Sequence, residues 1–230
     1  MEELLVDVID IVQYKDIIGY KSKKYRDVLV EYMNIKDKSL DFEKGEYVSI
    51  SFNDLNLSLV DATIDSLNKF YKKSYKKVLV CGFGNPNVIC DSLGPLVCKK
   101  IHSPRIMSII PNVYSETGIK SYMHLEILAD ALKPDLVILI DSLRTTFFNR
   151  VLKNIQISTN ALIPGSGIYE KKNKKIKLNC DVLTIGIPTI IDGKSINKDL
   201  PENVYLTYKD IDSNLEYLSF IIANSINSVF

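Results

Sequence analysis

Two unbroken runs of apolar residues stand out along the chain. KVLVCGF (Lys77–Phe83) and DLVILID (Asp135–Asp141) are continuous, which is typical of strands buried on both faces. A shorter run, RIMSIIP, lies between them, and helices are predicted from Ser92 to Ile101 and over Ile119–Leu132, where Pro134 ends the second one. Strand, helix, strand, helix and strand in this order imply right-handed parallel crossovers. We therefore predict an α/β fold with helices on both faces of a sheet.

The first part of the chain has a different pattern. YRDVLVEY and EYVSISF alternate apolar and polar residues like half-buried strands, and Leu55–Tyr71 has helical spacing. We divide the chain into an N-terminal segment, residues 1–76, packed on an α/β peptidase-like core, residues 77–230. Further elements of the core are predicted as the strands IQIS and LTIGIP and a C-terminal helix near Ile211–Phe230.

Charge and composition narrow the class of protein. Lys plus Arg is 29 and Asp plus Glu is 28, so no net charge attracts nucleic acid or a membrane surface. No window holds the ~20 apolar residues of a spanning helix, and the start MEELLVDVIDIVQYKD is too acidic for a signal peptide. The four cysteines lack the spacing of a zinc site. We expect a cytoplasmic protein with reduced thiols, no nucleic-acid or membrane partner, and neither a cofactor nor a metal.

The loop after the first apolar run, GFGNPNVICDSLGP, carries the first candidate residues. Gly84 allows a sharp turn, and Asn85 and Asn87 can hydrogen-bond the backbone or a ligand, so we assign these three to substrate binding or support. The third glycine of a dinucleotide fingerprint is missing, and no P-loop G-K-[ST] follows. Asp91 falls where a helix should begin, so it either caps that helix or takes part in chemistry.

Asp141 ends the third apolar run, at the edge where open α/β sheets bind ligands. A buried carboxylate needs a partner or a raised pKa, so Asp141 either binds amides of a neighbouring loop or acts chemically. Two turn-rich segments, IPGSG and GIPTIIDG, should meet the same edge. Their polar residues Ser166, Thr189 and Asp192 are assigned to substrate binding or support, beside the alternative of plain turn chemistry.

Two carboxylates facing one crevice are suited to general acid–base hydrolysis. Asp91, near a helix N-terminus, should ionise more readily, whereas Asp141, in an apolar setting, should hold its proton longer. Two alternatives stay open: a thiol nucleophile built from Cys90 with His102 or His124, and a metal site that uses both aspartates with one histidine.

Four blocks in sequence resemble a known family. GFGNPNVICDSLGPLV, KPDLVILIDSL, IPGSG and IGIPTIID are similar, in order, to the signature blocks of the germination protease of spore-forming bacteria. The resemblance implies a three-layer α/β/α fold of the hydrogenase-maturation-protease type, with a mostly parallel sheet. It also implies an atypical aspartic endopeptidase, made as a zymogen, that degrades small acid-soluble spore proteins in the forespore or spore core. Asp91 and Asp141 fall on the family's two catalytic aspartates, and a homo-oligomer is implied.

The chain also departs from the family pattern. The family's enzymes are longer, and no copy of their processing site is found before Tyr25. Lys120 replaces the glutamate that follows Thr-Gly-Ile in the family, and Ile163 stands in place of the histidine of His-Pro-Gly-Ser-Gly. These departures support a second hypothesis, a non-catalytic or regulatory sporulation relative that kept the fold.

Overall fold

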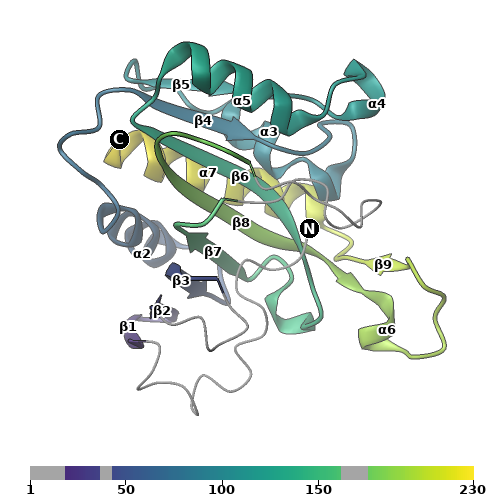
Figure 1. Cartoon of the computed structure of the whole chain (residues 1–230). Helices are drawn as coiled ribbons and strands as arrows, with labels where there is room; N and C mark the ends of the chain where they lie inside the picture. The colour runs from purple at the N-terminus through teal and green to yellow at the C-terminus, as the bar shows by residue number, and fades with distance from the viewer. Residues whose placement is uncertain (1–18, 37–42, 162–175) are drawn as a thin grey trace.

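The computed structural model describes residues 19–36, 43–161 and 176–230, and within them nine strands form one sheet (Figure 1). The order across the sheet is β1-β2-β3-β7-β8-β6-β4-β5, and β9 pairs with β8. The strands are β1 (Lys21–Tyr25), β2 (Val28–Ile35), β3 (Gly45–Ser51), β4 (Val78–Gly82), β5 (Ile106–Ile109), β6 (Leu136–Thr145), β7 (Asn154–Ser158), β8 (Asp181–Asp192) and β9 (Tyr205–Leu206).

The sheet is parallel at its centre and antiparallel on one side. β8, β6, β4 and β5 are parallel neighbours, whereas β1, β2, β3 and β7 join β8 through antiparallel pairs. The predicted α/β class and the parallel crossovers are confirmed. The expected mostly parallel sheet is instead mixed, because short connections such as Arg26–Asp27 reverse the chain and force antiparallel pairing.

Helices cover both faces of the sheet, as the three-layer prediction requires. One face carries α2 (Leu57–Asn68), α3 (Leu93–Cys98) and α7 (Ile211–Val229), which crosses behind β6 and β8 in Figure 1. The other face carries α5 (Ser121–Leu132). Ile138 and Ile140 pack with α7, while Val137 and Leu139 pack with Leu125 of α5. Successive strand residues point to opposite faces, which explains why β6 must be apolar throughout. The remaining short helices are α4 (Tyr114–Thr117), α6 (Gly193–Ile196) and the 3₁₀ turns η1 (Ile89–Asp91) and η2 (Phe148–Arg150).

Most predicted elements form close to their expected bounds, but two strands are longer than predicted. The strand predicted as LTIGIP is β8, Asp181–Asp192, so GIPTIIDG lies mostly in a strand and the prediction of a turn there is wrong. The predicted strand ending at Asp141 instead continues to Thr145, because Ser142–Thr145 pair with β8 beyond the end of β4. The division at residue 76 stays a prediction, but β3 pairs with β7, so strands from both sides of it share one sheet. In the described ranges, no helix has the length and apolar character needed to cross a membrane.

Candidate active site

The loop between β4 and α3 is folded back on itself at Gly84. Gly84 has a φ of +114°, and a Cβ added there would lie 1.9 Å from the carbonyl oxygen of Asp91. Only glycine tolerates both the positive φ and this close approach. The loop therefore brings Asp91 against the end of β4, as the glycine-rich pattern suggested.

The Asp91 carboxylate is held by this same loop. Its Oδ2 accepts a hydrogen bond from the backbone N–H of Asn85 at 2.8 Å. The Asn85 side chain accepts one from the backbone N–H of Asn87 at 2.9 Å, and Asn87 Nδ2 donates to Glu116 at 3.2 Å. The N-cap position of α3 is Ser92, so the helix-cap explanation of Asp91 is wrong. Asn85 and Asn87 shape the loop that positions Asp91.

Asp141 lies on the parallel strand next to β4. The two strands stay hydrogen-bonded up to the loop, since the Phe83 N–H donates to the Ile140 carbonyl at 2.8 Å. The Asp141 side chain is buried, and its Oδ1 accepts a hydrogen bond from the Ser142 backbone N–H at 2.7 Å. The two aspartates thus meet at the carboxyl end of β4, which is the arrangement expected from parallel pairing.

The surroundings of both carboxyl groups favour the protonated form. Burial, followed by the negative charge of Asp91, raises the pKa of Asp141 from 3.8 to about 8. Burial also raises the pKa of Asp91, and the Asn85 N–H opposes that rise because it stabilises the ionised form. Mutual electrostatic influence means that the aspartates titrate as a pair, with Asp141 keeping its proton to higher pH.

Thr189 connects the segments that carry the two aspartates. Its buried hydroxyl donates to the carbonyl of Cys90 at 2.6 Å and lies 3.5 Å from the carbonyl of Leu143. Its own carbonyl accepts a hydrogen bond from the Thr207 hydroxyl at 2.6 Å. Thr189 therefore fixes the residue before Asp91 to the end of β6.

The other assigned residues lie elsewhere or outside the described chain. Asp192 accepts a hydrogen bond from the Lys194 N–H at 3.2 Å as the N-cap of α6. Gly186 is the β8 partner of Asp141, so Asp192 lies six residues further along, about 20 Å at a normal strand rise. Turn chemistry accounts for this contact of Asp192. Ser166 and Ile163 fall outside the described residues.

The alternative chemistries find less support in the geometry. The His102 ring lies 3.1 Å from the Lys100 carbonyl and 3.0 Å from Asn227 Nδ2, in a contact with α7 rather than with Cys90. Within the described residues, no group of three or more His, Cys, Asp and Glu side chains is arranged to hold a metal ion.

Two residues near the pair were missed by the sequence reasoning. Glu116 contacts the site loop through Asn87, and the spacing of nearly thirty residues between them gave no signal. The buried Ser142 hydroxyl has no hydrogen-bond partner among the described residues. Its position directly after Asp141 was the only available clue.

Comparison with known proteins places this chain in a family. A family model described as germination protease matches residues 10–204. The chain belongs to the germination protease family. The four blocks that suggested this resemblance all lie within the matched range.

Several curated germination proteases match over much of the chain. The one from Oceanobacillus iheyensis is 30% identical over 219 residues, covering 80% of this chain and 60% of that protein. The one from a Geobacillus species is 31% identical over 191 residues, covering 70% and 51%. The one from Clostridium tetani is 26% identical over 234 residues, covering 86% and 72%. The chain thus spans only about half to three fifths of the length of the first two relatives.

One solved structure shows a weaker likeness to this germination protease family member. The [NiFe] hydrogenase maturation protease HycI from Thermococcus kodakarensis matches with a TM-score of 0.41 and 17% identity, covering 70% of this chain and 98% of that one. At these values the likeness supports no conclusion about the present chain.

Proposed function

We propose that this chain is an aspartic-type endopeptidase in which Asp91 and Asp141 hydrolyse a peptide bond by general acid–base catalysis. The observation that carries the proposal is the pair itself. A half-buried carboxyl group in η1 after β4 and a buried one on the adjacent parallel strand β6 both have raised pKa values, and the charge of Asp91 helps to raise that of Asp141. Perturbed titration of paired carboxylates at a sheet edge is typical of catalytic sites. Membership of the germination protease family supports the same assignment.

The environments of the two aspartates suggest separate roles. The Asn85 N–H stabilises ionised Asp91, which would take a proton from water as the water oxygen attacks the peptide carbonyl carbon. Asp141, still protonated near neutral pH, would give its proton to the amide nitrogen as the C–N bond breaks. Exchange of protons between the pair and solvent then restores the starting state.

Small acid-soluble spore proteins are the substrate class that we propose. The support is the likeness of the site blocks to germination proteases, together with the suitability of an open sheet edge for extended chains. Activity in the cytoplasm of the forespore or spore core, synthesis as a zymogen and a homo-oligomeric form belong to the same proposal.

A non-catalytic or regulatory relative is the second candidate. Lys120, at the N-cap of α5, stands in place of the family's glutamate, and the chain spans only part of its relatives. Both aspartates and the loop that holds Asp91 are kept, and for this reason we favour the peptidase.

The test is incubation of the purified chain with a small acid-soluble spore protein, followed by mass spectrometry. We expect cleavage by the unchanged chain and a rate at least about 100-fold lower in D91N and in D141N, since acid–base catalysis contributes about 10²–10⁴-fold. D130N, which removes an exposed carboxylate on α5, is the matched control and should cleave normally. Cleavage that survives in both site variants would reject the mechanism, whereas an inactive unchanged chain would favour the non-catalytic candidate or an unprocessed zymogen.

A further inference from the structure

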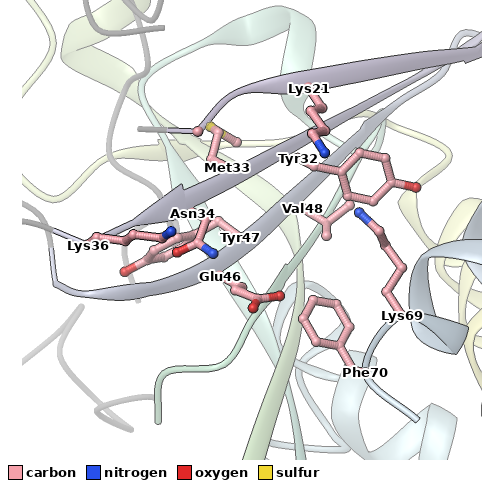
Figure 2. Close-up of a pocket in the computed structure, with 11 residues that line it drawn as sticks. Lys21, Tyr32, Met33, Asn34, Lys36, Glu46, Tyr47, Val48, Lys69 and Phe70 are labelled. Carbon is pink, nitrogen blue, oxygen red and sulfur yellow. The ribbon is translucent and has the colours of Figure 1, made fainter. Parts of the chain in front are cut away.

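A cavity lies away from the aspartates, beside the antiparallel part of the sheet. Its volume is about 290 Å³, and it is bounded by strands β1, β2 and β3 and by the end of α2 (Figure 2). These strands are separated from β6 by β7 and β8. The cavity is therefore distinct from the candidate active site.

The lining of this cavity is rich in positive charge. Lys21 comes from β1, Lys36 follows β2, and Lys69 follows α2, whereas Glu46 is the one carboxylate in the lining. Figure 2 shows the ammonium ends of Lys21 and Lys69 directed toward the ring of Tyr32. Three ammonium groups against one carboxylate make the concave surface electropositive.

The three lysines of the cavity differ from the lysines just outside it. Lys23, two residues from Lys21 on β1, pairs with Asp65 at 3.2 Å, and Lys72, three residues after Lys69, pairs with Asp181 at 2.7 Å. Among the described residues, the cavity lysines form no such ion pair. The two lysines outside the cavity are paired with carboxylates, whereas the three cavity lysines share Glu46 as the one carboxylate among the lining residues.

The ammonium of Lys69 contacts an aromatic ring of the cavity. It lies 3.2 Å from the centroid of the Tyr32 ring. Burial lowers its pKa, the nearby charge of Lys21 lowers it further, and Glu46 opposes both. The backbone N–H of Lys69 donates to the Leu67 carbonyl at the end of α2, but its ammonium contacts the Tyr32 ring instead of the last carbonyls. The side chain is held over the cavity.

We propose that this cavity binds an oxyanion, the carboxylate or phosphate group of a ligand, between Lys21, Lys36 and Lys69. Ionised oxygen acceptors form short, strong hydrogen bonds with ammonium donors, and a concave surface lets three such donors converge on one oxyanion. The rings of Tyr32 and Phe70 line the same cavity and offer an apolar surface to the rest of the ligand. This binding site does not depend on the proposed peptidase activity.

The experiment measures binding by amide NMR at constant ionic strength, with two separate probes. One probe is inorganic phosphate, and the other is a hexapeptide of glutamate. We expect saturable shifts on β1, β2, β3 and the residues after α2. In the K21Q/K69Q double variant, binding should weaken at least about tenfold, because two charge-assisted contacts are lost.

The matched control is K23Q/K72Q. It removes the same number of charges from the same two places on the chain, but from lysines that are already paired. Binding by this control should equal that of the unchanged chain. Saturation with phosphate alone would identify a free oxyanion as the ligand, and saturation with the peptide alone would identify an acidic segment. Shifts that do not saturate, or an affinity that falls equally in both double variants, would show only nonspecific attraction of anions to positive charge. Either result would overturn the proposal.

Discussion

The pKa values of two aspartates in this chain are shifted in opposite directions by their surroundings. Asp135 is exposed and accepts backbone N–H bonds from Lys76 and Lys77 at 2.8 and 2.9 Å, and these bonds lower its pKa. Asp141, six residues later and within β6, is buried, and its pKa rises to about 8. Residue type alone therefore does not decide the chemistry, because burial and hydrogen bonding set the charge state.

Stability should fall between about pH 4 and pH 8 on account of Asp141. Its folded-state pKa of about 8 lies above the ordinary 3.8, so across this window the unfolded chain releases a proton that the folded chain keeps. One unit of pKa shift corresponds to about 1.4 kcal/mol. We expect the unchanged chain to lose more than about 1.4 kcal/mol relative to D141N between pH 5 and pH 8, measured by urea unfolding. Parallel pH dependence in the two proteins would contradict this.

Replacing Gly84 by alanine should disrupt the loop that holds Asp91. The new Cβ would overlap the Asp91 carbonyl oxygen at 1.9 Å, in addition to the strain of a positive φ. We expect G84A to lower the free energy of unfolding by about 3 kcal/mol, against about 1 kcal/mol for G118A. Gly118 is the matched control, because it also has a positive φ of 68° but no atom within 4 Å of an added Cβ. Equal losses of unfolding free energy in G84A and G118A would show that the loop moves away from the added Cβ without a loss of stability.

At the scale of elements, β4, η1, β6 and β8 form the framework of the site. Thr189 on β8 should matter through its hydroxyl, which binds the Cys90 carbonyl. T189V leaves that carbonyl without its donor and should cost about 1–3 kcal/mol in urea unfolding, with altered NMR shifts for Asp91. T189S keeps the hydroxyl, so its stability and its Asp91 NMR shifts should be close to those of the unchanged chain. A serine variant as disturbed as the valine variant would point to lost methyl packing instead.

Elements could be predicted where the pattern of apolar residues within the element itself determines the structure. β4 and β6 could be predicted because both faces of each are buried, which makes their sequences apolar without interruption. Asp91 and Asp141 could be brought together because parallel neighbours share one carboxyl edge. The extension of β6 through Ser142–Thr145 could not be predicted, because these mixed residues depend on pairing with β8. The contact of Thr189 with Cys90 spans 99 residues and has no local pattern.

At the scale of the whole molecule, the N-terminal strands complete the sheet. β3 covers the edge of β7 along five paired positions, from Tyr47↔Ser158 to Ser51↔Asn154. The pairing joins parts of the chain about a hundred residues apart. The pattern of apolar residues in either strand does not predict which strand it pairs with. The lysine-lined cavity arises in the same way, since its three lysines come from separate elements.

A fragment of residues 77–230 should therefore aggregate and lose stability. It would expose the apolar positions and the free backbone edge of β7, and such edges promote association. We expect the fragment to form aggregates in size-exclusion chromatography and to lose cooperative thermal unfolding. A monomeric fragment with an unchanged, sharp transition would show that residues 1–76 are a separable segment.

The proposed mechanism requires Asp91 and Asp141 to act as one coupled pair. The most direct measurement is a pH titration of the Asp141 carboxyl carbon by NMR, in the unchanged chain and in D91N. We predict a pKa near 8 in the unchanged chain and a clearly lower value in D91N, because the negative charge of Asp91 helps to raise it. A pKa near 4 in the unchanged chain, or the same value with and without the Asp91 charge, would contradict the account.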